Sequence, residues 1–158
     1  MLDFGLVKWF TQRDVQQLAE MVETLVVRRD IHAFRQATEA AGFLRPDPAL
    51  TDEQVAAYFD SYNKLVLACG PVAVSPEYAS ETVRTVFDAR NEVVKRANIP
   101  PPFVMLQRIN LGLYAVLAGL GASADWRRIG EEIWPFTESP PSTALGWAEA
   151  AWRAKAMR

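Results

Sequence analysis

Helix-start signals recur along this chain, and they restrict its fold more than any other feature. A residue able to cap a helix stands before each of several runs with helical spacing: Thr11, Asp30, Thr51, Ser75 and Asp125. A cap oxygen accepts a hydrogen bond from a free amide of the first turn, so such a residue marks where a helix begins. Nothing after Val7 alternates apolar and polar residues over a useful length. The sequence therefore predicts an all-α body.

Apolar spacing and glycine or proline stops give the extent of each expected helix. We predict helices over residues 12–27, 31–42, 52–69, 76–98, within 98–122, over 126–134, and from about 143 onward. A break near Arg90 and Asn91 is the alternative for the fourth. The segment 98–122 opens with prolines and is the most hydrophobic, so we expect it to be the core helix.

Composition limits the size and the partners of the fold. The chain has 158 residues, of which 50% are hydrophobic and 23% charged, as expected for one soluble domain with one core. A net charge of -2 argues against nucleic acid as a partner. No signal peptide or bilayer-spanning stretch is evident, so a cytoplasmic location is expected. The single cysteine, Cys69, falls on the apolar face of its predicted helix, which predicts a buried, inert thiol in a reducing compartment.

The first residues differ from the rest, because Leu2 to Val7 read as a short strand without a hairpin partner. This orphan strand contains Asp3, Phe4 and Gly5, the tripeptide that binds magnesium in protein kinases. By itself the tripeptide is a weak signal. The alternative is a tight turn, in which Gly5 supplies permissive dihedral angles and Asp3 bonds a nearby amide.

Motifs further along the chain give the tripeptide more weight. They are Pro101-Pro102, Leu106 to Arg108, Gly112-Leu113, Leu120 to Ala122 and Trp126-Arg127. Their order and spacing after the opening motif resemble the C-terminal part of the UbiB/AarF family of atypical kinase-like proteins. The resemblance implies a helical C-lobe portion over residues 1–136, followed by a Pro-rich turn and a C-terminal helix over residues 137–158. It also implies an ATP-binding protein linked to isoprenoid-quinone biosynthesis or lipid homeostasis.

The resemblance transfers a role in metal and cofactor binding to the opening tripeptide alone. It implies that Asp3 holds Mg²⁺ on the phosphates of ATP, that Phe4 packs beneath the site, and that Gly5 lets the chain turn. Phosphoryl transfer also needs an N-lobe lysine and a catalytic loop, and no residue here matches either; the only histidine, His32, is not in such a loop. We therefore expect no catalytic residue and no tight binding of Mg²⁺ or ATP to this chain alone.

Polar residues inside the most hydrophobic segment need partners. Gln107, Arg108 and Asn110 interrupt it, and a buried guanidinium without a partner is costly. We predict a structural hydrogen-bonding network, with Arg108 paired to a carboxylate or to backbone carbonyls. Glu131 and Glu132 are adjacent, so they diverge rather than form a catalytic pair, and a solvated face is expected.

The remaining aromatic and basic residues have two interpretations. His32 has no metal-ligand spacing around it and is expected at a surface or helix start. Trp147 and Trp152 are expected to pack on preceding helices, and peripheral membrane contact is the alternative.

The leading hypothesis is a UbiB-type C-lobe fragment whose partner is a missing N-terminal kinase-like portion. The second is a stand-alone helical module that binds a protein or lipid.

Overall fold

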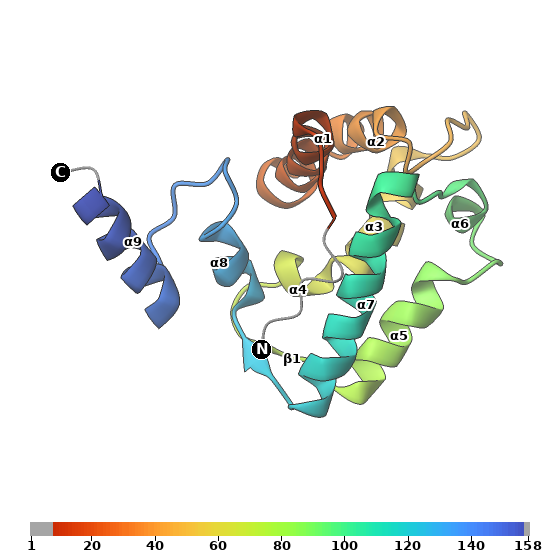
Figure 1. Cartoon of the computed structure of the whole chain (residues 1–158). Helices are drawn as coiled ribbons and strands as arrows, with labels where there is room; N and C mark the ends of the chain where they lie inside the picture. The colour runs from red at the N-terminus through yellow and green to blue at the C-terminus, as the bar shows by residue number, and fades with distance from the viewer. Residues whose placement is uncertain (1–7, 157–158) are drawn as a thin grey trace.

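The computed structural model describes residues 8–156, and these residues are mostly helical, which confirms the all-α prediction (Figure 1). The predicted orphan strand lies outside the described residues. The elements are α1 (Gln12–Val22), the π-helical turn η1 (Glu23–Arg28), α2 (Ile31–Ala40), α3 (Asp52–Tyr62), α4 (Lys64–Leu67), β1 (Val72–Ala73), α5 (Pro76–Val86), α6 (Glu92–Arg96), the 3-10 turn η2 (Pro101–Phe103), α7 (Val104–Gly119), β2 (Ser123–Ala124), α8 (Trp126–Glu131) and α9 (Ala144–Ala156).

The predicted caps are confirmed. Thr11 and Thr51 each accept a bond from the amide three residues on, and the side chains of Asp14 and Gln54 bond back to the cap amides. The other caps accept from the amides of Ala33, Tyr78 and Arg128, and they are Asp30, Ser75 and Asp125. Each cap satisfies a free amide, which is why these helices begin where the sequence predicts.

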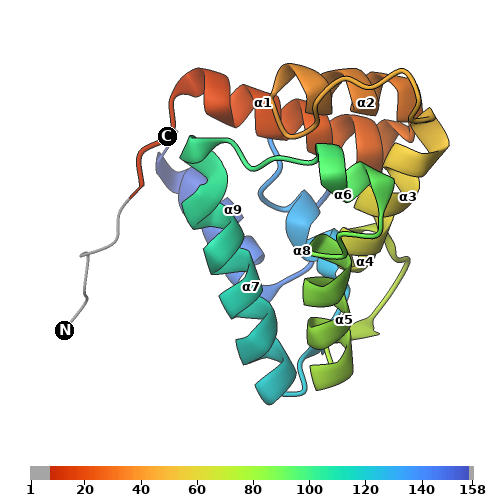
Figure 2. The ribbon, with the colours of Figure 1, turned by 90° about the vertical axis from the view of Figure 1, so that its right-hand side faces the viewer.

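The helices form a layer of α1, η1 and α2 across one end of α3, α5 and α7 (Figures 1 and 2). The main core lies where these groups meet and is built from Leu25, Val26, Phe34, Leu44, Leu50, Val55, Tyr58 and Val93. A smaller core contains Leu65, Val74 and Ala118. The antiparallel pair β1–β2 lies beside it, and the Trp126 indole nitrogen donates to the Val72 carbonyl at 2.7 Å.

The long helix predicted over residues 52–69 is interrupted. The Asn63 side-chain amide donates to the Phe59 carbonyl at 2.8 Å, and Asn63 leaves the helical region between α3 and α4. Helix α4 then ends at Leu67, so Cys69 lies in the turn before Gly70 and is exposed. The prediction of a buried thiol is therefore wrong, because the helix ends before Cys69 and does not place it on the apolar face.

Two other segments depart from a continuous helix. Thr24 is buried, and its hydroxyl donates to the Glu20 carbonyl at 2.7 Å where α1 widens into η1. A threonine hydroxyl on a carbonyl one turn back bends a helix. The segment after α5 breaks, as the alternative near Asn91 predicts, because the Asn91 side chain accepts from the Val93 amide and starts α6.

Helix α7 is not the core helix that its hydrophobicity predicts. Only Ala118 of its residues is buried. The helix runs beside α5 at the edge of the layer, so one side faces the interior and the other is left open (Figure 2). Hydrophobicity alone does not determine burial, because burial also needs a neighbour on each side.

Helix α9 lies beyond α8, away from α3 and α7 (Figure 1). Trp147 and Trp152 are 59% and 67% exposed, so the prediction that they pack on preceding helices is wrong. The segment before α9 is held by hydrogen bonds to Glu132, at the C-cap of α8. The division of the chain at residue 136 stays a prediction.

Candidate functional site

The residues predicted to hold magnesium and ATP, Asp3, Phe4 and Gly5, lie outside the described residues, so their role stays a prediction. Within residues 8–156, no three His, Cys, Asp or Glu side chains are grouped as a metal site. His32 is on the surface at the start of α2, as expected, with its Nδ1 2.8 Å from the Asp52 carboxylate. Arg35 also forms an ion pair with Asp52, so these charged residues connect α2 to α3.

A cavity of about 610 Å³ lies beneath α1, between η1, α3 and α7. This volume is in the range of pockets that hold small molecules. Its lining comes from segments far apart in the chain and includes Leu18, Met21, Val22, Leu25, Phe59, Tyr62, Phe103, Leu106, Gln107 and Asn110. The sequence did not predict this cavity.

The cavity is apolar and carries no ionic groups. None of the described residues that line it is Asp, Glu, Lys, Arg or His. Burial raises the pKa of Tyr58 and Tyr62 in its wall, and the pKa of the neighbouring Tyr114 is raised by the same cause. Raised tyrosine pKa values indicate surroundings that solvate charge poorly. The interior beside α7 is therefore of low polarity.

A hydrogen-bonded pair, Tyr62 and Gln107, is among the polar residues that line this mainly apolar space. The Tyr62 hydroxyl donates to the Gln107 side-chain oxygen at 2.9 Å, and hydrogen bonds with Asn110 and Gln107 partly offset the effect of burial on the pKa of Tyr62. No residue of the described chain accepts a hydrogen bond from the Gln107 amide nitrogen. The Gln107 nitrogen is thus a donor without a described acceptor, whereas the lining amides of Asn63 and Asn98 donate to the carbonyls of Phe59 and Gly42.

The predicted network on α7 is confirmed for Gln107 and Asn110, and it includes Tyr62, which the sequence analysis did not place in it. Tyr62 falls on the apolar face of its predicted helix, a position typical of a core residue. A buried tyrosine needs a partner for its hydroxyl, and that requirement was the available signal. The prediction of a partner for Arg108 is wrong: its side chain is exposed and pairs with no carboxylate or carbonyl among residues 8–156.

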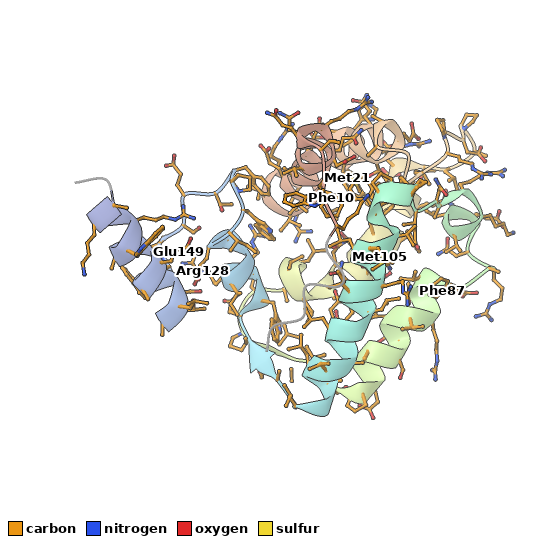
Figure 3. The ribbon with its side chains drawn as sticks, in the orientation of Figure 1. Phe10, Met21, Phe87, Met105, Arg128 and Glu149 are labelled. Atoms are coloured by element: carbon orange, nitrogen blue, oxygen red, sulfur yellow. The ribbon has the colours of Figure 1, made fainter. Side chains whose placement is uncertain are left out.

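One residue of the cavity lining lies at the surface just after α5. Phe87 lines the cavity and is 60% exposed. In Figure 3, Met21 and Phe10 lie where α1 meets the start of α7, while Phe87 lies to the side, near the end of α5. Phe10 stacks on the lining residue Phe103, with 5.9 Å between the ring centroids.

Helix α7 also presents an exposed row of apolar side chains, here called the outer stripe. It consists of Ile109, Leu113 and Val116 of α7 and of Leu120 at its C-cap, which are 50–74% exposed. Steps of four, three and four residues place these side chains along one line of the helix. Monomeric proteins seldom expose a continuous apolar row of this kind.

The two glutamates of the α8 end are not a solvated face, which corrects that prediction. Glu131 bonds with Arg127, Arg128 and Ser139, and its side chain is only 12% exposed. Glu132 accepts from the backbone amides and hydroxyls of Ser142 and Thr143 just before α9. These bonds, led by the Ser142 hydroxyl, lower the pKa of Glu132 to about 2. Both carboxylates therefore bind the segment that connects α8 to α9.

Comparison with known proteins finds no matching family model, curated protein or solved structure. In the described part of the chain, no helix is both long enough and apolar enough to cross a bilayer.

Proposed function

We propose that this chain is a helical binding module that docks a protein partner on the outer stripe of α7. The observation that carries the proposal is the exposure of Ile109, Leu113, Val116 and Leu120 on the most hydrophobic helix of the chain. Covering such a row removes apolar surface from water, which is the main driving force of protein association.

The shape of the stripe favours a helical partner. Its four, three, four spacing is that of a seam between two packed helices. Gly112 and Gly119 lie beside it, and a Cβ atom at either position would meet nothing within 4 Å. Another backbone can therefore approach closely at these glycines. Arg108 is the only charged residue of α7, so a partner carboxylate opposite it would fix the register.

The resemblance to the UbiB/AarF family supplies a first candidate for that partner. It is the N-terminal kinase-like portion, which carries the lysine and the catalytic loop that this chain lacks. ATP and Mg²⁺ would then belong to the assembly, with Asp3 as one metal ligand, and the role would lie in isoprenoid-quinone biosynthesis or lipid homeostasis. The family resemblance supports this assignment.

Titration calorimetry with such a kinase-like portion from the same genome tests the docking surface. We expect Leu113→Glu to weaken association at least tenfold, since it places a charge in the apolar contact. Val15→Glu changes a residue of α1 that is 51% exposed and should leave association unchanged. Equal affinities for wild type and Leu113→Glu would contradict the proposal.

The same mixture tests the cofactor assignment. We expect Mg²⁺-ATP to bind the assembly and not the chain alone, and Asp3→Ala to abolish the binding. Tight nucleotide binding by the isolated chain would contradict this part.

The exposed tryptophans of α9 favour a second candidate, peripheral contact with a membrane. Trp147 and Trp152 lie on a helix with Arg153 and Lys155 in its last turn, a combination typical of interfacial helices. Co-sedimentation with anionic liposomes should fall when both tryptophans are replaced by alanine. Sedimentation that does not depend on them would remove this candidate.

A further inference from the structure

The cavity under α1 and the outer stripe meet on α7. Gln107 and Asn110 line the cavity and do not belong to the stripe, whereas Leu106, which also lines it, lies three residues before Ile109 and so continues the line of the stripe. Most of the cavity lining comes from other elements. Its function is therefore derived from that lining.

We propose that this cavity binds one uncharged, mainly apolar small molecule that carries a carbonyl or similar hydrogen-bond acceptor. A pocket with apolar walls and few polar groups is the usual form of a small-molecule site, with the polar groups fixing the orientation of the ligand. Here the volume of about 610 Å³ is sufficient, and the lining residue Phe87 is 60% exposed, so the cavity wall extends to the surface.

The absence of ionic groups among the described lining residues determines the charge of the ligand. A carboxylate or phosphate in this cavity would lose its hydration and find no cation to replace it. The same holds for an ammonium group, which would find no carboxylate. Only an uncharged molecule avoids that cost.

The polar end of the ligand is determined by the hydrogen-bonding state of Gln107. Its oxygen is occupied by the Tyr62 hydroxyl at 2.9 Å, and its amide nitrogen has no acceptor in the described chain. The site thus offers a donor and requires an acceptor from the ligand. Because the Tyr62 bond polarises the amide, that donor is strengthened.

Fluorescence titration of the full chain tests the proposal with two uncharged dyes. Prodan carries a ketone, and N-phenylnaphthylamine does not. We expect both to bind saturably with one molecule per chain. Prodan should emit at a longer wavelength than in an apolar solvent, because its ketone accepts a hydrogen bond in the site.

Two variants locate the binding. Leu18→Phe adds volume inside the cavity and should weaken both dyes about tenfold, while Val15→Phe makes the same type of change on the exposed side of α1 and should weaken neither. If both variants bind like wild type, or if neither dye saturates, the cavity is not the site.

A double variant tests the hydrogen bond. Tyr62→Phe with Gln107→Met removes both partners of this bond together, so that only Asn110 loses a hydrogen-bonding neighbour, and circular dichroism checks that the fold is kept. It should weaken prodan about three- to tenfold, shift its emission to shorter wavelength and leave N-phenylnaphthylamine unchanged. Equal losses for the two dyes, or no loss for prodan, would overturn the assignment of Gln107. None of these measurements involves the partner of the outer stripe, so this proposal and the proposed function fail independently.

Discussion

The bond between Tyr62 and Gln107 makes a quantitative prediction about the interior beside the cavity. The Tyr62 hydroxyl donates to the Gln107 oxygen at 2.9 Å, and both side chains are partly buried. Tyr62→Phe leaves the Gln107 side-chain oxygen without its donor, and Gln107→Met leaves the hydroxyl of Tyr62 without this acceptor. The double variant leaves no orphan in this pair.

The asymmetry of hydrogen-bond energetics fixes the magnitudes. A buried polar group left unpaired lowers the free energy of unfolding by about 1–3 kcal/mol. Because this pair is only partly buried, we expect each single variant to lose about 1.5 kcal/mol, in the lower half of that range. Replacing both partners by apolar groups of similar shape is nearly neutral, at about 1 kcal/mol or less. The two singles should therefore sum to about 3 kcal/mol, and a coupling energy of about 2 kcal/mol should appear in the cycle.

Urea unfolding followed by circular dichroism measures the stability of the wild type, the two single variants and the double variant. With a slope of about 1–3 kcal/mol per molar urea, each single variant should lower the midpoint by about 0.5–1.5 M. Additive effects, with the double variant the least stable, would refute this reasoning. Additivity would mean that water reaches the polar pair and replaces each lost partner.

Three further predictions concern other parts of the chain. Arg35→Lys should cost about 2 kcal/mol in urea unfolding, because one ammonium cannot reproduce the guanidinium bonds to two carboxylates and two carbonyls, and a loss below about 0.5 kcal/mol would contradict this. The pKa of Glu132 is lowered, so its hold on α9 should be complete above its ordinary pKa of 4.5 and be lost only as the pH falls through about 2. The amide shifts of Ser142 and Thr143 in nuclear magnetic resonance should titrate near that lower value, and titration near 4.5 would disprove the bonding. Cys69 is exposed, so Ellman's reagent should label it completely without denaturant, whereas labelling only after unfolding would restore the prediction of a buried thiol.

The candidate site was predictable only in part. Gln107 and Asn110 could be recognised as a network because polar residues in an apolar helix need partners. Their partner Tyr62 could not, since it reads as one more apolar-face residue of α3. The cavity depends on segments from α1 to α7 meeting at one place, and no local pattern encodes their distance.

The sequence by itself determined where helices begin. A cap and its amide are three residues apart, as in Thr11 with Asp14 and Thr51 with Gln54, so the interaction is complete within one turn. Only the tertiary structure decided which apolar surfaces are covered. Helix α7 has the composition of a core helix, yet Leu113 and Val116 face outward, since burial is a property of neighbouring elements and not of the helix that carries the side chains.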